Sequence, residues 1–193
     1  MTWEELHSAV ARCRRCPLHL ERTMPVFGEG PRDSSVLFVG EGPGAEEDLS
    51  GRPFVGRSGR FLSQLMEEAG VPRESVFISN VVRCRPPGNR DPKPAEVAAC
   101  LPWLERLIDL LKPEVVVTVG NVPSRLLLDT KVGITSLRGE FHRCRFAERE
   151  LTVRPIFHPS YLLRNRSRER GKPLSLTLDD LRALSPWLAG GIP

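Results

Sequence analysis

Residues 36–44 read VLFVGEGPG, a run of four apolar residues followed by a glycine-rich loop. A short apolar run bounded by turn residues predicts a buried strand of a parallel sheet. A second, mainly apolar run at residues 153–157 leads into the polar loop HPSYLLR at residues 158–164. Because open α/β sheets build their sites where the strands end, we expect the chemistry of this chain to lie in these two loops.

Around these two strands, the chain alternates between predicted strands and predicted helices. We expect further strands at 76–79 and 115–119, and a hairpin at 139–157. Helices are expected at 3–12, 58–69, 95–111, 123–128 and 176–188, with an irregular loop at 83–94 and a basic surface loop at 165–173. This order predicts an α/β fold in a single domain, residues 1–193, with three layers (α/β/α) around a mainly parallel four-stranded sheet.

The composition is that of a globular protein with a basic surface. The chain has 193 residues, of which 40% are apolar, a formal net charge of +4, and 28 basic residues of which all but four are arginine. Arginine suits bidentate contact with phosphate, so an anionic polymer is a candidate partner, although a solvated surface of mixed charge explains most such clusters. No apolar stretch reaches the length of a membrane span, and the first residues are acidic and amphipathic, so we expect a cytoplasmic protein without a membrane partner.

Four of the five cysteines have a spacing that predicts a metal site. Cys13 and Cys16 form a C-x-x-C pair, and Cys84 and Cys100 follow in the middle of the chain. A C-x-x-C pair can direct two thiolates at one centre, and a loop that folds back can add two more. The ligand type leaves both zinc and an iron–sulfur cluster open. Cys144 lies in a segment that alternates like a strand, and we expect it to be a small apolar residue.

Polar or glycine residues end each central strand: Gly40 and Glu41, Asn80, Gly120 and Asn121, and His158. The ends of parallel strands meet at one edge of a sheet, and Phe54 on the glycine-rich loop lies near that edge. An asparagine satisfies adjacent donor and acceptor groups, a phenylalanine stacks on a ring, and a histidine stabilises negative charge on a leaving group. Singly, each residue has an ordinary structural explanation, but the set predicts a site for a small planar heterocycle.

A dinucleotide-binding loop is the main alternative for this glycine-rich segment. Residues 40–45, GEGPGA, formally match the G-x-G-x-x-A pattern after a strand. However, acidic residues at 46–48 would face the pyrophosphate, Pro43 lacks an amide donor, and the next strand ends in Ser79-Asn80 rather than in a ribose-binding acid. We therefore expect no nucleotide cofactor, and we interpret residues 46–48 by themselves as a solvated acidic turn.

Several motifs taken together resemble the family 4 uracil-DNA glycosylases, the thermostable iron–sulfur type. In chain order they are GEGPGAEED at 40–48, GRPFVG at 51–56, Asn80 with CRPP at 84–87, and HPSYLLR at 158–164. The cysteine spacing also matches, and the resemblance extends from Cys13 to about Arg164. It implies a uracil-DNA glycosylase-like domain that removes uracil from DNA by hydrolysing the N-glycosidic bond.

The resemblance also implies a cofactor and roles for individual residues. A 4Fe-4S cluster is expected on Cys13, Cys16, Cys84 and Cys100. The expected uracil-binding residues are Gly40, Glu41 and Gly42 in the pocket wall, Phe54 stacked on the base, Asn80 at its polar edge, and His158 facing the uracil O2. The expected catalytic residues are His158, which stabilises the departing anion, and a carboxylate that orients water, Glu41 first and Glu47 second.

The partner implied is uracil-containing DNA, single- or double-stranded, bound by a monomer. Reaching the base requires flipping it out of the stack. The expected DNA contacts are Arg57 and Ser58, Ser160 and Arg164 at phosphates, and Tyr161, Leu162 or Leu163 as a wedge, with a core role as the alternative for Leu162 and Leu163. Two other functions remain open: a non-catalytic iron–sulfur module that binds nucleic acid, and a glycosylase specific for hypoxanthine or mismatched thymine.

Overall fold

A five-stranded sheet forms the centre of the molecule in the computed structural model, which describes residues 1–188. The strands are β1 (Val36–Gly40), β2 (Phe77–Asn80), β3 (Val115–Val119), β4 (His142–Phe146) and β5 (Arg149–Ile156). Their order is β2-β1-β3-β5-β4, with β4 antiparallel and the other four parallel. The mainly parallel α/β fold is confirmed, but the sheet has five strands rather than four because both arms of the hairpin join it. The last five residues of the expected domain, 189–193, lie outside the described part.

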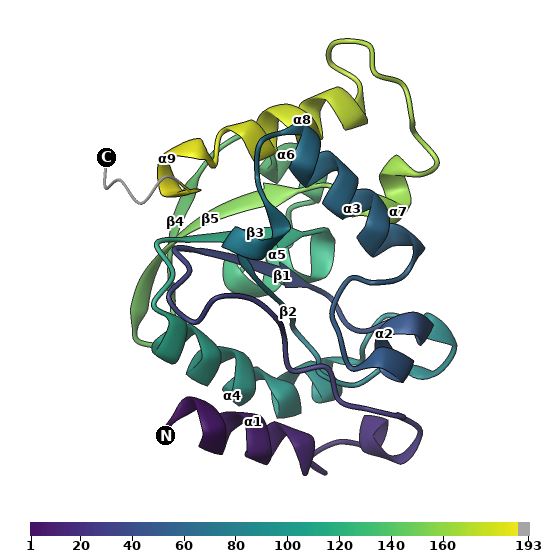
Figure 1. Ribbon diagram of the computed structural model, residues 1–193, viewed down its shortest axis with the longest axis vertical. Helices are drawn as coiled ribbons and strands as arrows, with labels where there is room; N and C mark the ends of the chain where they lie inside the picture. Colours follow the sequence, from purple (N-terminus) through teal and green to yellow (C-terminus); the bar gives the residue numbers. More distant parts are fainter. Residues whose placement is uncertain (189–193) are drawn as a thin grey trace.

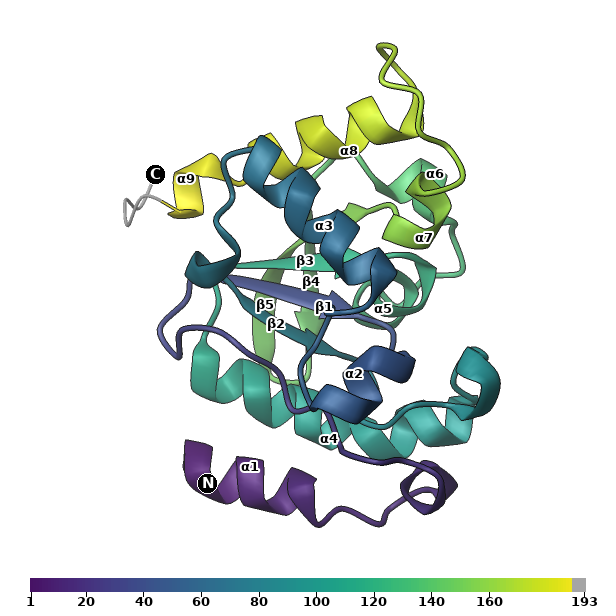
Figure 2. The same ribbon diagram turned by 45° about the vertical axis from the view of Figure 1, so that its right-hand side comes forward.

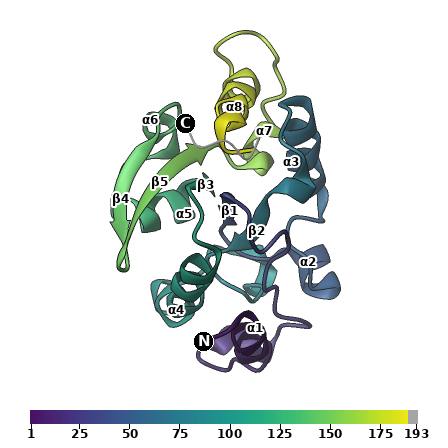
Figure 3. The same cartoon turned by 60° about the vertical axis from the view of Figure 1, so that its left-hand side comes forward.

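Helices cover both faces of the sheet (Figures 1 and 3). The long helices are α3 (Arg57–Glu68) and α8 (Pro173–Arg182) on one face, and α1 (Trp3–Ala11) and α4 (Pro94–Leu111) on the other. Alternate residues of β1 pack on opposite sides, Val36 and Phe38 toward α3, Leu37 and Val39 toward α4. Both faces are therefore buried, which explains why β1 reads as a continuous apolar run.

The shorter helices lie mainly around the ends of the strands. They are α2 (Ala45–Ser50), α5 (Asn121–Leu127), α6 (Ile134–Leu137), α7 (Pro159–Leu162) and α9 (Ser185–Leu188), with 3-10 turns η1 (Pro17–Leu20), η2 (Arg73–Ser75) and η3 (Pro87–Asn89). Among residues 1–188, no helix combines the length and the apolar character needed to cross a membrane.

Two sequence-based expectations about helices are wrong. Residues 46–48 do not form a solvated acidic turn: they lie in the first turn of α2, where acidic residues are favourable, and Glu47 and Asp48 are buried. The helix expected at 176–188 begins earlier, at Pro173, and ends at Arg182, with α9 as a separate turn. Proline suits the first turn of a helix, which explains the earlier start. Pro186 has no N–H to donate to the Arg182 carbonyl four residues earlier, so one continuous helix cannot run through this segment.

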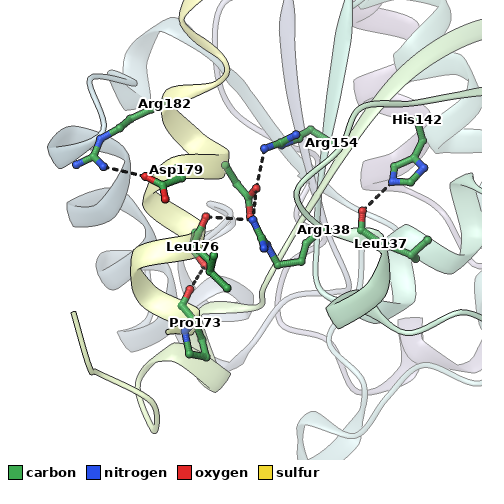
Figure 4. A network of polar contacts seen from close by, with 10 residues as sticks. Leu137, Arg138, His142, Arg154, Pro173, Leu176, Asp179 and Arg182 are labelled. Atoms are coloured by element: carbon green, nitrogen blue, oxygen red, sulfur yellow. Dashed lines mark hydrogen bonds and ion pairs between the residues drawn. The ribbon is translucent and has the colours of Figure 1, made fainter. Parts of the chain in front are cut away.

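A buried ion triad fixes α8 against β5. The Asp180 carboxylate, which is fully buried, accepts hydrogen bonds from Arg138 Nε and Nη2 and from Arg154 Nη2, each at 2.7 Å. Figure 4 shows the two guanidinium groups reaching toward α8. Such charge-assisted bonds fix geometry as well as contributing energy. The triad therefore holds β5 in place, and β5 leads directly into His158.

Candidate active site

A cavity of about 650 Å³ opens where the four parallel strands end. Figure 2 shows α2, α5, α7 and the start of α3 gathered around this edge of the sheet. The residues of its wall that the sequence singles out are Glu41, Gly42, Glu47, Phe54, Arg57, Ser58, Asn80, Gly120, Asn121, His158 and Ser160. The strand ends and the two loops therefore form one concave site, where ligands of open α/β sheets bind.

Asn80 and Phe54 lie together at the base of this site. Asn80 is 1% exposed, and its Oδ1 atom has no hydrogen-bond partner among the described residues. Gly40 does not line the cavity, but a Cβ atom there would overlap both the Phe54 ring and Asn80 Oδ1. Glycine at this position thus lets an aromatic ring and an amide approach each other closely beside the strand.

The loop that carries Phe54 is fixed in an uncommon conformation. Phe54 has a φ of 51°, in the left-handed region, which is unfavourable for a bulky residue. Arg73 donates to the carbonyl oxygens of Pro53 and Phe54 at 2.6 and 3.3 Å, and Gly59 leaves room for the Phe54 backbone, which a Cβ would overlap. These contacts hold the ring in position before any ligand arrives.

Glu47 holds the two halves of the glycine-rich segment together. Its carboxylate accepts hydrogen bonds from three backbone N–H groups, those of Gly44 at 3.1 Å, Val55 at 2.9 Å and Gly56 at 2.7 Å. The side chain both caps α2 and fixes the loop that precedes α3. Its oxygens are thus largely occupied by the backbone.

His158 presents a defined face of its imidazole ring. Its Nδ1 atom accepts a hydrogen bond from the backbone N–H of Ser160 at 3.1 Å and lies 2.7 Å from the Ser160 hydroxyl. Burial, and then the charge of Arg164, lower the pKa of His158 below its ordinary value, so the ring is neutral at pH 7. In a neutral imidazole whose Nδ1 accepts, the proton is on Nε2, which becomes the available donor.

Comparison with known proteins identifies the family. The family model described as the uracil DNA glycosylase superfamily matches residues 27–182. The chain belongs to this superfamily. The Type-4 uracil-DNA glycosylase of Thermotoga maritima is 50% identical over 96% of this chain and 94% of its own length. Those of Sulfurisphaera tokodaii and Pyrobaculum aerophilum are 42% and 40% identical, over 84% and 85% of this chain and 76% and 86% of their own lengths.

A pair of carboxyl groups lies in the cavity of this superfamily member. Burial, and then the charge of Asp91 and a hydrogen bond with it, together raise the pKa of Glu41 to about 7. Asp91 follows η3 and lines the same cavity, as does Asn89. Sequence reasoning missed Asp91 because it treated residues 83–94 as an irregular loop. The one signal in the sequence that could have indicated Asp91 is that it lies between Cys84 and Cys100, two candidate metal ligands.

The residues expected to contact DNA divide into two groups. Arg57, Ser58 and Ser160 line the cavity, whereas residues 161–164 are not among its lining residues. Tyr161 is exposed, packs against Phe157 at 5.2 Å between ring centroids, and is followed by Leu162, which is 0% exposed in the core. Leu162 therefore has a core role and is not exposed to act as a wedge in DNA. Leu163 is half-buried and Arg164 is exposed.

Four cysteines of the superfamily member gather between the amino-terminal segment and α4. Cys84 and Cys100 are buried, and Cys13 and Cys16 pack against the same core. Burial raises the pKa of Cys100 to about 11, and burial also raises the pKa of Cys84. Cys144 lies apart on β4, half-buried, as its strand pattern predicts.

The surroundings of these thiols fit a group bound by sulfur. Three N–H groups point at them: Arg22 Nη1 at 3.0 Å from Cys84 Sγ, the Arg83 backbone N at 3.3 Å from Cys100 Sγ, and Trp103 Nε1 at 3.3 Å from Cys13 Sγ. Hydrogen bonds of this kind stabilise thiolates and tune iron–sulfur clusters. Within residues 1–188, no three His, Cys, Asp or Glu side chains are grouped closely enough to hold one metal ion. A cluster binds each cysteine through a different iron, so its ligands need not converge on one point.

Proposed function

We propose that this superfamily member is a uracil-DNA glycosylase that flips uracil out of DNA, hydrolyses its N-glycosidic bond and leaves an abasic site. The names of its curated relatives and the resemblance of its motifs to family 4 support the proposal. The observation that carries it is the buried Asn80 amide beside the Phe54 ring, with an oxygen that lacks a partner among the described residues. An unpaired buried acceptor costs free energy, so the site favours a ligand that donates to it.

Uracil supplies the complementary edge. Its N3–H donor lies next to its O4 acceptor, and an asparagine amide can pair with both at once. Cytosine presents an acceptor at N3 and an amine at position 4, which reverses the pattern and leaves both groups of Asn80 unpaired. The Phe54 ring then binds the face of the base by stacking. Gly42 lies in the cavity wall, and Gly40 leaves room for the Phe54 ring and the Asn80 amide that contact the base.

The bond is broken by departure of the base as an anion. The electron pair of the N-glycosidic bond stays on uracil, and the sugar becomes cation-like until water adds to it. In our proposal the neutral His158 donates its Nε2–H to the uracil O2, where negative charge develops. A donor oriented before the reaction stabilises the transition state more than the ground state.

Glu41 is the residue we assign to the attacking water. It lines the cavity, and its pKa of about 7 leaves it able to accept a proton near neutral pH. The water adds its oxygen to the sugar carbon and gives its proton to the carboxylate or to solvent. Glu47 is less suited to this task because three backbone N–H groups occupy its oxygens, and we assign it to positioning of the loop.

The proposed partner is uracil-containing DNA, single- or double-stranded, bound by a monomer. Arg57 and Ser58 at the amino-terminal end of α3, together with Ser160, lie where phosphates flanking a flipped base would approach. Arg164 supplies a further exposed cation, and its charge acts on His158. Tyr161 and Leu163 are the remaining wedge residues for the space that the flipped base leaves.

The cofactor we propose is a 4Fe-4S cluster on Cys13, Cys16, Cys84 and Cys100. When bound, it supplies four metal–sulfur bonds that tie the amino-terminal segment to the loop after β2 and to α4. The three N–H groups at the sulfurs and the burial of Cys84 and Cys100 support this assignment.

The test is release of free base from single-lesion oligonucleotides. Protein purified without oxygen should release uracil and leave an alkali-labile site in uracil-containing DNA, while matched oligonucleotides with thymine or hypoxanthine stay intact. Asn80→Ala serves as the matched control, since it should bind the same DNA but release little uracil. Binding without release by the parent protein would instead identify a non-catalytic module, and release of hypoxanthine or thymine would identify a different specificity.

A further inference from the structure

Arg83 is a buried arginine that the proposed reaction does not use. It is 1% exposed, and it forms no ion pair with a carboxylate of residues 1–188. Its Nε and Nη2 atoms have no hydrogen-bond partner among the described residues. A buried guanidinium group without a counter-charge is costly, so its retention indicates a negative partner.

The cysteine site lies next to Arg83. Its backbone N–H donates to Cys100 Sγ at 3.3 Å, and the next residue in the chain is Cys84. The ionisable groups that act on its charge are these two cysteines. Four thiolates around an iron–sulfur core leave a net negative charge, which one buried guanidinium group can offset in part.

The other side of Arg83 holds the end of β2. Its Nη1 atom donates to the backbone carbonyl of Asn80 at 2.6 Å and to the hydroxyl of Ser79. The Ser79 hydroxyl in turn donates to the carbonyl of Phe27 at 2.7 Å. Asn80 is the residue whose side chain faces the base in the proposed function, so Arg83 touches its backbone directly.

We propose that Arg83 is a positioning residue that balances the charge of the cysteine-bound cluster and at the same time fixes the Asn80 carbonyl. The cluster and the base-reading amide are then one connected unit, joined through a single side chain. This inference rests on the proposed function, because it uses both the cluster and the role of Asn80. It assigns the cluster an effect on uracil recognition in addition to its structural one.

The test compares Arg83→Met, which keeps the length of the side chain and removes the charge, with Arg83→Lys, which keeps the charge. The measurements are iron and sulfide per chain, the reduction potential of the cluster, and the Kd for labelled free uracil by equilibrium dialysis. Arg83→Met should lose iron or hold a cluster that is harder to reduce, because a neighbouring positive charge favours the reduced form. Its uracil affinity should fall about tenfold, the size of one lost hydrogen bond. Arg83→Lys should recover the potential and part of the affinity.

Two further variants test the two contacts of Arg83 separately, the one with the cluster and the one with Asn80. Arg22→Met removes an N–H donor from Cys84 Sγ but has no contact with Asn80, so it should change the potential with less than a twofold effect on uracil affinity. Ser79→Ala removes the other partner of Arg83 Nη1 without changing charge, so it should weaken uracil binding while the iron content stays complete. Ser79→Ala also decides the question if Arg83→Met does not fold.

The inference is overturned if Arg83→Met keeps its iron, its potential and its uracil affinity, or if Arg22→Met weakens uracil binding as much as Arg83→Met does. Unchanged uracil affinity in Ser79→Ala also overturns it. Failure of the proposed function has a different signature, because it would appear in the parent protein itself, as a colourless preparation or as absence of uracil release.

Discussion

Replacement of Asp91 by asparagine should move the acid limb of the pH–rate profile to lower pH. The pKa of Glu41 is about 7, raised first by burial and then by the charge of Asp91 and a hydrogen bond with it. Asp91→Asn removes the charge but leaves the burial. The pKa of Glu41 should therefore fall, while remaining above its ordinary value of 4.5.

The size of the effect follows from the ionised fraction of Glu41. A like charge within hydrogen-bonding distance raises a carboxyl pKa by on the order of one unit. If the pKa falls from about 7 to about 6, the ionised fraction at pH 6 rises from roughly one tenth to one half. The quantity to compare is the single-turnover rate at pH 6 divided by the rate at pH 8 of the same protein. This ratio should be about fivefold higher in Asp91→Asn than in the parent protein.

The assay is uracil release with enzyme in excess, measured from pH 5 to pH 9. Asp91→Glu is the matched control, since it keeps the charge and should keep the parental limb, and Glu41→Gln should abolish the limb. His158, in the same cavity, has a pKa lowered by burial, so its own titration lies at lower pH. An acid limb that stays in place or moves to higher pH in Asp91→Asn would refute the assignment of Glu41 as the base tuned by Asp91.

Thermal unfolding offers a readout of the same pair that is independent of activity. The folded-state pKa of Glu41 lies above the unfolded value, so its contribution to stability is present below about pH 4.5 and is lost as the pH rises through about 7. In Asp91→Asn this loss should be smaller. Equal pH dependence of the melting temperature in both proteins would argue against a contact between the two carboxyl groups.

Four other predictions follow from single side chains. Asn80→Ala should slow uracil release by about 10- to 100-fold in single-turnover assays, because an unpaired polar edge of the base costs roughly 1–3 kcal/mol. An unchanged rate would show that Asn80 does not recognise uracil. His158→Ala should slow cleavage by about two orders of magnitude while DNA affinity, measured by anisotropy, changes little. Cys144→Ser should keep the full iron content, whereas Cys84→Ser should lose it, by metal analysis. Asp180→Asn should lower the free energy of unfolding by about 3 kcal/mol in denaturant titrations, because it removes the carboxylate that pairs with the buried Arg154 and the half-buried Arg138.

The parallel strands and the two loops at their ends could be predicted because both signals are local. The run at 36–39 is apolar throughout, the run at 115–119 has Thr118 as its one polar residue, and the structure buries every residue of both. The hairpin predicted at 139–157, by contrast, does not show in the sequence whether its first strand, β4, pairs with the sheet. The predicted number of strands was therefore four instead of five. The short helix α2 escaped prediction because its acidic residues look solvated in sequence, whereas Glu47 is buried against three backbone N–H groups that come from two separate segments.

In the candidate site, too, residues that lie at strand ends could be predicted, whereas residues placed by the path of a loop could not. The positions of Asn80 and His158 in the cavity could be predicted because each lies at or close to the end of a strand. Asp91 could not, because its position beside Glu41 depends on how the chain from 84 to 100 folds back, and no periodic pattern encodes that path. For Leu162 the sequence left two alternatives for a related reason: an apolar residue in a polar loop can face DNA or the core. Packing in the apolar cluster that includes residues of α3 and α8 decides for the core.

The path of residues 80–100 connects the parts of the site that the sequence leaves separate. Asn80 ends β2, Arg83 and Cys84 follow it into the cysteine site, and Asp91 then faces the cavity before Cys100 returns to the cysteines in α4. The loop that bears Asp91 is therefore anchored at both of its ends by proposed cluster ligands. Closing a loop at both ends lowers its conformational freedom, which favours the contact with Glu41. It follows that loss of a ligand such as Cys100 should loosen Asp91 as well as the metal site, so the acid limb of Cys100→Ser should move in the same direction as that of Asp91→Asn.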